Sequence, residues 1–217
     1  MNLDSFNCFF GEILSYILDN KNLIIEIIGT ITGLFVVLLQ YRASHWFAVV
    51  GSISSALYIY IFYHSKFYAD AVESIYYLGA NLYALFFWLY LKKKHQNKNY
   101  GGITRVGKTE ALILFAIFLI AMFAIRYILK TFTDSPVATG DAMTTAMSIV
   151  AMWLLARKNI EHWLVWTALN AISTGLYVWK GLYPTTLLYG TYTIISILGY
   201  LKWKKEMIKF EVHDSMA

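Results

Sequence analysis

Seven apolar stretches, each about as long as a membrane-crossing helix, dominate this 217-residue sequence. An α-helix rises about 1.5 Å per residue, so roughly 20 apolar residues cross a hydrocarbon core about 30 Å thick. Helix is the expected conformation, because an open strand would leave backbone N–H and C=O groups unpaired in lipid. The stretches occupy residues 23–41, 46–63, 70–91, 111–130, 138–156, 160–179 and 183–203.

The overall composition supports a membrane location. Hydrophobic residues make up 59% of the chain and charged residues only 14%, against about 25% charged residues in soluble domains. A soluble fold of this size could not bury so much apolar surface, whereas a bilayer is itself an apolar solvent. We therefore predict an all-α integral membrane protein with seven transmembrane helices, and not an enzyme. Residues 5–18 are short for a full span and are interpreted as an interfacial helix, with a short extra span as the alternative.

The basic residues predict the orientation of the chain. With seven spans, 13 of the 18 lysines and arginines fall in loops on one side of the membrane. Cytoplasmic loops carry the excess of basic residues, so the C-terminus is expected in the cytoplasm. The net charge of +5 is then a topology signal with some attraction to anionic lipid, and nucleic acid is not an expected partner.

An internal repeat relates the two halves of the sequence. Tyr68 precedes Trp88 by 20 positions, and Tyr183 precedes Trp203 by the same distance. Two like-oriented three-helix units joined by a linker helix form a parallel repeat, whose substrate site is expected between the units near the midplane. The predicted organisation is an interfacial helix (1–22), a first bundle (23–91), a loop with the linker helix (92–137), a second bundle (138–205) and a cytoplasmic tail (206–217).

Polar and aromatic residues share helix faces near the middle of two spans. Span 160–179 carries Trp163, Trp166, Asn170 and Tyr177 at helical spacing, and span 70–91 carries Tyr77, Asn81 and Trp88. An amide in lipid costs free energy unless it faces a partner or a cavity. Stacking rings and hydrogen-bonding amides suit a flat, polar, aromatic ligand, and Trp faces also attract cationic rings.

Structural explanations for the same residues remain open. Trp88, Trp163 and Trp203 could belong to the aromatic belts at the membrane surface, and Asn170 could serve only to bond a neighbouring helix. Acidic residues near the span ends are expected to snorkel or to pair with basic groups: Glu26, Asp70, Glu73, Asp141 and Glu161. Alternatively, Asp141 with Thr144 and Ser148 could line an outer entrance along span 138–156.

Other motifs do not support an enzyme. Residues 102–109 match the letters of a phosphate-binding loop, but they follow a run of polar and basic residues where that motif requires a buried strand. The five histidines show no metal-ligand spacing, and the single cysteine, Cys8, excludes an internal disulfide. Neither a metal nor a cofactor is expected.

Two parts of the chain resemble a known family. The stretches Asp134-Ser-Pro, Asp141-Ala-Met-Thr-Thr and Glu161-His-Trp-Leu-Val-Trp166 with Asn170 resemble the PnuC family of bacterial vitamin transporters. Asn81-Leu-Tyr83 and Trp88 agree in the first half. The residues Tyr41-Arg-Ala-Ser with Tyr68-Ala-Asp70 are more similar to the thiamine-transporting branch.

This resemblance implies a seven-helix fold similar to the sugar-transporting SWEET proteins, often trimeric, in the bacterial inner membrane. It implies uptake of nicotinamide riboside by facilitated diffusion, with trapping by a cytosolic kinase; thiamine is the alternative. A sugar carrier, or a helical receptor or assembly protein, remains a more distant possibility. The expected substrate-binding residues are Trp166, Asn170, Asn81, Trp163, Tyr77, Tyr83, Trp88, Tyr177, Tyr192, Asp141, Thr144 and Ser148.

Overall fold

A computed structural model describes residues 32–64, 68–94, 102–133, 137–179, 181 and 183–215. Within this part of the chain there are seven helices, and its single bridge joins Thr104 to Asn159. The helices are Thr32–Tyr41, α3 (Trp46–His64), α4 (Tyr68–Lys94), α5 (Lys108–Phe132), α6 (Ala138–Ala156), α7 (His162–Trp179) and α8 (Tyr183–Ser215). The seven-helix, all-α prediction is confirmed. The predicted helix in residues 1–22 lies outside the described residues.

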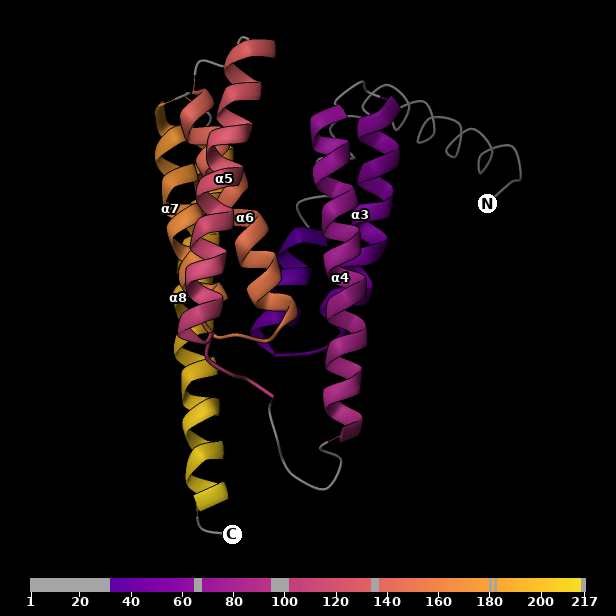
Figure 1. The fold of residues 1–217 in the computed structure, drawn as a ribbon, viewed down its shortest axis with the longest axis vertical. Coiled ribbons are helices and arrows are strands. Elements are labelled where there is room, and N and C mark those ends of the chain that lie inside the picture. Colours follow the sequence, from indigo (N-terminus) through magenta and orange to yellow (C-terminus); the bar gives the residue numbers. More distant parts are fainter. Residues whose placement is uncertain are drawn as a thin grey trace, which may run out of the picture.

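The helices form two groups that run side by side (Figure 1). α3 packs on α4, while α5, α6, α7 and α8 pack in chain order into the second group. α4 and α6 connect the groups through a less extensive contact. The helix Thr32–Tyr41 also reaches the second group, because the Trp203 indole of α8 donates to the Gln40 carbonyl at 3.2 Å. We call this boundary the seam.

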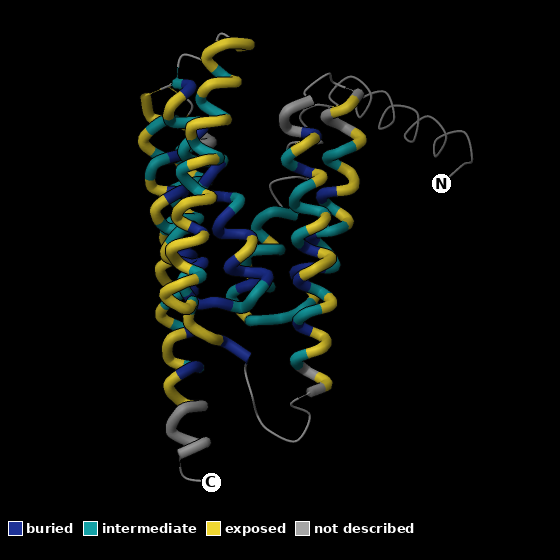
Figure 2. Tube along the Cα trace, viewed as in Figure 1, coloured by how far each residue is buried: buried dark blue, intermediate teal, exposed yellow. Residues whose placement is uncertain are grey.

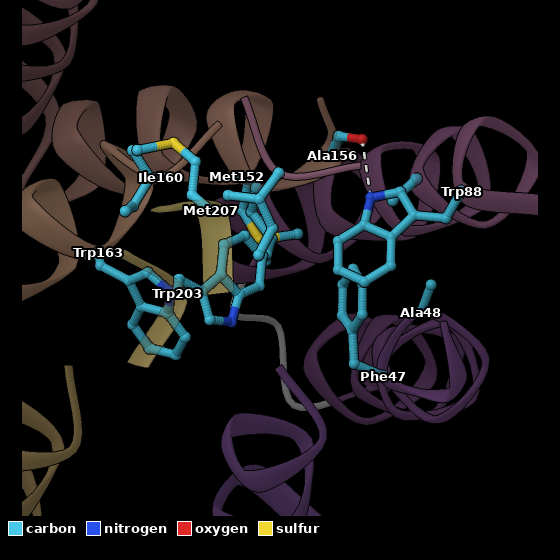
Figure 3. Close-up of a cluster of buried hydrophobic side chains, with 12 residues drawn as sticks. Phe47, Ala48, Trp88, Met152, Ala156, Ile160, Trp163, Trp203 and Met207 are labelled. Carbon is cyan, nitrogen blue, oxygen red and sulfur yellow. Dashed lines mark hydrogen bonds between the residues drawn. The ribbon is translucent and has the colours of Figure 1, made fainter. Parts of the chain in front are cut away.

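The largest buried cluster lies near the end of the seam where the C-terminal helix extends (Figures 1 and 3). The rings of Trp88 and Phe47 lie 4.7 Å apart between centroids, and those of Trp163 and Trp203 lie 5.8 Å apart edge-on. Figure 2 shows the contrast between this buried interior and the exposed outer helix faces. We call this buried cluster the aromatic core. Its buried members are Phe47, Ala48, Ala84, Trp88, Ile103, Met152, Leu155, Ala156, Ile160, Trp163, Trp203 and Met207.

Two matching corners turn the chain at this end. Ala43, two residues after the helix Thr32–Tyr41, has a φ of +50°, and Lys158, two residues after α6, has a φ of +62°. In both corners the next amide reaches back five residues, from Ser44 to Leu39 and from Asn159 to Leu154. This is the Schellman pattern, which satisfies helix carbonyls left over at a C-terminus.

The segment that resembles a phosphate-binding loop has a structural role. Residues 102–107 lie against the α6–α7 corner, where the Thr104 amide donates to the Lys158 carbonyl at 3.1 Å. The Val106 amide donates to Glu161 Oε2 at 3.0 Å. These two amides are therefore occupied and do not point at a phosphate.

α5 displays its apolar side chains outward. Its Leu112 is 71% exposed and its Ile120 is 69% exposed, which an apolar helix in water would avoid. By length and composition, the described helices include two candidates for crossing a membrane, Ala71–Leu91 and Lys108–Phe132. Thr32–Tyr41 and Trp46–Tyr60 are apolar but shorter. The burial pattern of α5 fits a helix that faces lipid.

Candidate functional site

The polar and aromatic stripe on α7 faces the interior. Trp163 and Asn170 are buried, and Trp166 lies half-buried against the aromatic core. The indole nitrogen of Trp166 is buried and has no hydrogen-bond partner within the described residues. A buried donor without a partner calls for an explanation. Trp166 therefore supplies an unused donor one helical turn from the Asn170 amide.

Each of the two mid-span asparagines contacts the helix packed beside its own: α8 for Asn170 on α7, and α3 for Asn81 on α4. Asn170 Nδ2 on α7 donates to Ser196 Oγ on α8 at 3.3 Å. Asn81 on α4 packs against Gly51 of α3 so closely that a Cβ at Gly51 would lie 2.9 Å from Asn81 Nδ2. Both amides are about 95% buried, so neither points at acyl chains. Asn170 does bond a neighbouring helix, as the structural explanation required.

A group of tyrosines linked by ring contacts lies near one carboxylate at the seam. Tyr77 donates from its hydroxyl to Glu73 Oε1 at 2.7 Å, and Ser148 of α6 approaches the same oxygen at 3.1 Å. Tyr189 of α8 is close enough to Glu73 to interact electrostatically. Its ring lies 5.0 Å from that of Tyr177 and 5.9 Å from that of Tyr192 between centroids. We call these residues the tyrosine–glutamate cluster: Glu73, Tyr77, Ser148, Tyr177, Tyr189 and Tyr192.

This cluster brings together four of the expected site residues from four helices. They are Tyr77 (α4), Ser148 (α6), Tyr177 (α7) and Tyr192 (α8). The cluster lies toward the end of the bundle opposite the C-terminus, because Glu73 follows the start of α4 by five residues and Tyr177 precedes the end of α7 by two. It contains hydroxyls and one carboxylate, and no basic side chain.

Trp88 and Trp163 lie in the aromatic core. They are 3% and 1% exposed, so they are not belt residues with rings at a lipid surface. Trp88 Nε1 donates to the Ala156 carbonyl at 3.1 Å, as Figure 3 shows. Trp163 packs against Trp203 and against His162, whose ring centroid is 4.6 Å away. A substrate contact by either indole stays a prediction.

Two of the remaining expected residues, Tyr83 and Thr144, make contacts outside these groups. Tyr83 is 37% exposed and stacks on Trp153 with the ring centroids 5.5 Å apart. Thr144 directs its hydroxyl to the backbone of its own helix, at Gly140 and Asp141, over 3.1 Å in each case. Tyr83 therefore contacts neither of the groups described above, whereas Thr144 and Asp141 lie one and two helical turns before Ser148 on α6. A surface hollow of about 370 Å³ lies elsewhere, on α5.

Sequence reasoning missed two members of the tyrosine–glutamate cluster. Glu73 was expected to snorkel or to pair with a basic group, but its carboxylate accepts from Tyr77 instead. Glu161 likewise accepts from a backbone amide. Tyr189 received no role. The available signal was spacing, because Glu73, Tyr77 and Asn81 repeat every four residues and therefore share one face of α4.

This chain is similar to known transporters in both sequence and fold. The nicotinamide riboside transporter PnuC of Escherichia coli (strain K12) is 26% identical over 205 residues, which cover 82% of this chain and 84% of that protein. The transporter of the same name from Haemophilus influenzae is 26% identical over 189 residues, covering 83% and 79%. The structure titled "Crystal structure of the Vitamin B3 transporter PnuC" has a TM-score of 0.66 at 21% identity, covering 94% of this chain and 90% of that chain.

The sequence pattern of one family matches almost the whole described chain. That pattern, described as nicotinamide mononucleotide transporter, matches residues 23–205, which include both asparagines, the α7 stripe and the tyrosine–glutamate cluster. The resemblance to the PnuC family read from the sequence is confirmed. The chain belongs to the nicotinamide mononucleotide transporter family.

Proposed function

We propose that this chain is a membrane transporter that takes up nicotinamide riboside by facilitated diffusion. A cytosolic kinase then traps the imported riboside by phosphorylating it. The observation that carries the proposal is the α7 stripe, where Trp166 offers a buried, unpartnered indole N–H next to the buried Asn170 amide. An indole face suits a cationic ring, and an amide suits a carboxamide or ribose hydroxyl. The relatives named above carry the same substrate in their names.

The charge of the seam favours the riboside over the mononucleotide. A mononucleotide adds a phosphate, whose recognition in proteins relies on Arg, Lys or helix N-termini. The tyrosine–glutamate cluster instead presents the Glu73 carboxylate, which repels a phosphate. The riboside has hydroxyls in its place, and these can bond to neighbouring hydroxyls.

Matching features in the two halves of the chain support our proposal of transport by rocking around a central site. The matching corners at Ala43 and Lys158 lie 115 positions apart, as do Trp88 and Trp203. Each of these indoles donates across the seam, to the Ala156 and Gln40 carbonyls respectively. Such equivalence is expected if residues 23–91 and 138–205 are parallel repeats that move against each other.

The membrane arrangement completes the proposal. The family is one of integral inner-membrane proteins, in agreement with the outward apolar face of α5. We place the C-terminus in the cytoplasm, because α8 ends with exposed Lys204, Lys205 and Lys209 and basic residues concentrate on that side. We further propose a homotrimer in the bilayer.

Uptake by purified protein in proteoliposomes tests this function. Labelled nicotinamide riboside should equilibrate across the membrane without an ion gradient, and nicotinamide mononucleotide should not. Thiamine is tested in the same assay, and flux of thiamine without flux of nicotinamide riboside would make thiamine the substrate. Absence of flux for every compound would favour a receptor or assembly protein.

Two substitutions test the site itself. Trp166→Ala and Asn170→Ala should each abolish uptake while the protein still expresses, because they remove the stacking face and the amide. Trp179→Ala is the matched control on α7, since Trp179 is 67% exposed. Calorimetric binding of the riboside that is unchanged in both variants would remove Trp166 and Asn170 from the site.

A further inference from the structure

Glu73 is an acidic side chain held by neutral donors. Tyr77 donates at 2.7 Å, and the Ser148 hydroxyl lies 3.1 Å away. Ser148 has one proton, which it also directs to the Thr145 carbonyl at 2.8 Å, so Tyr77 is the main donor. Within the described residues, no lysine, arginine or histidine forms an ion pair with Glu73.

Hydroxyl donors orient a carboxylate without cancelling its charge. In a transmembrane helix an acidic residue is rare and marks an ion or substrate path. The charge acts strongly there, because a low-dielectric surrounding weakens Coulomb screening. Glu73 therefore leaves a negative potential at the seam that a cation can complement.

The tyrosine rings near Glu73 favour the same kind of ligand. The ring of Tyr189 contacts those of Tyr177 and Tyr192, and Tyr189 is the one of the three that interacts electrostatically with Glu73. Aromatic faces attract organic cations through the ring quadrupole. A carboxylate with neighbouring aromatic rings thus selects a flat cation over a neutral ring of equal shape.

We propose that Glu73 is the specificity-determining counter-charge for a cationic aromatic ring, such as an N-glycosylated pyridinium. This inference rests on the proposed transport function and adds the residue that reads the charge. Because Glu73 belongs to α4 and Ser148 to α6, a cation at Glu73 lies at the seam between the two helix groups.

A pair of ligands that differ in charge tests the proposal. Nicotinamide riboside carries a pyridinium, and its 1,4-dihydro form keeps the same substituents without the charge. Calorimetry on the full-length protein should show the cation binding at least about tenfold more tightly, which corresponds to about 1.4 kcal/mol. In Glu73→Gln, which keeps an oxygen acceptor for Tyr77, this ratio should fall below about threefold.

Two further variants keep the result interpretable. Glu110→Gln is the control, since Glu110 accepts from the exposed Trp153 indole between α5 and α6, and it should keep the wild-type ratio. Glu73→Asp retains the charge and should keep a ratio above that of Glu73→Gln. If Glu73→Gln does not fold, the wild-type ratio and Glu73→Asp carry the test.

The outcomes separate this inference from the proposed function. Wild-type protein that binds neither nicotinamide riboside nor thiamine overturns both. Wild-type protein that binds the two riboside forms equally overturns the role of Glu73 alone. A full preference for the cation in Glu73→Gln would likewise overturn only the role of Glu73.

Discussion

A single glycine makes room for the most buried indole on α7. A Cβ at Gly199 of α8 would lie 2.7 Å from three atoms of the Trp163 ring. That ring cannot move away, because Trp163 is 1% exposed and packs against Trp203 and His162. Glycine is therefore required at position 199 by packing and not by backbone conformation.

Gly199→Ala should consequently destabilise the protein. Overpacking by one methyl typically costs about 1–3 kcal/mol, which should lower the melting temperature in detergent. Gly190→Ala is the matched control on the same helix, because nothing lies within 4 Å of its added Cβ. Equal melting temperatures for the two variants would contradict the packing at Trp163.

At the same scale, the sequence predicted side chains that share a helix face but not their partners. Trp166, Asn170 and Tyr177 could be placed together because α7 repeats every 3.6 residues. The role of Glu73 could not, since Ser148 is 75 positions away and on another helix. Spacing along one helix contains no information about which helix faces it.

At the element scale, the two corners carry backbone strain that can be measured. A residue with a side chain in the left-handed region costs roughly 1–2 kcal/mol, and glycine avoids most of that cost. Ala43→Gly should therefore raise thermal stability by about 1 kcal/mol. Lys158→Gly should gain less, because Lys158 Nζ lies 4.4 Å from the centroid of the Trp88 ring and that contact would be lost.

A glycine introduced inside a helix serves as the control, because there it should lower stability instead of raising it. Ala168 is exposed in the middle of α7, where replacement of alanine by glycine costs about 1 kcal/mol. Thermal unfolding in detergent should thus rank Ala43→Gly above wild type and Ala168→Gly below it. A loss of stability in Ala43→Gly would mean that the corner differs from the Schellman geometry.

Helix positions were predicted better than helix ends. α6 has the predicted bounds, because Ala138–Ala156 is an apolar run between polar loops. α4 and α8 continue past the predicted spans to Lys94 and Ser215. Hydropathy marks where side chains leave lipid, whereas Lys and Glu are good helix formers that continue the helix beyond that point.

On the scale of the whole molecule, contacts at two levels join the helix groups. Near the cluster, the Tyr76 hydroxyl of α4 donates to the Ile149 carbonyl of α6 at 2.7 Å. At the other level, the aromatic core excludes solvent, with Trp203 0% and Ala156 1% exposed. The seam is therefore closed at the C-terminal end, and the proposed rocking would have to separate the aromatic core to open that side.

The indole bonds of Trp88 and Trp203 should resist that separation. Each net hydrogen bond contributes about 1 kcal/mol, so Trp88→Phe with Trp203→Phe should favour opening by about 2 kcal/mol, or roughly 30-fold. Cysteine labelling measures this in a Cys8→Ser, Ala156→Cys background, since Cys8 is the single native cysteine. The double variant should label faster with an aqueous thiol reagent.

Loss of an indole donor elsewhere should not have this effect. Trp153→Phe is the control, because the Trp153 indole donates to Glu110 of α5 at 3.2 Å and not across the seam. Its ring stacks on Tyr83 of α4, and a phenyl ring can keep that contact. A rise in Ala156→Cys labelling in this variant would reflect general loosening of the fold. An unchanged rate in the double variant would mean that packing in the aromatic core, and not the paired hydrogen bonds, holds this end closed.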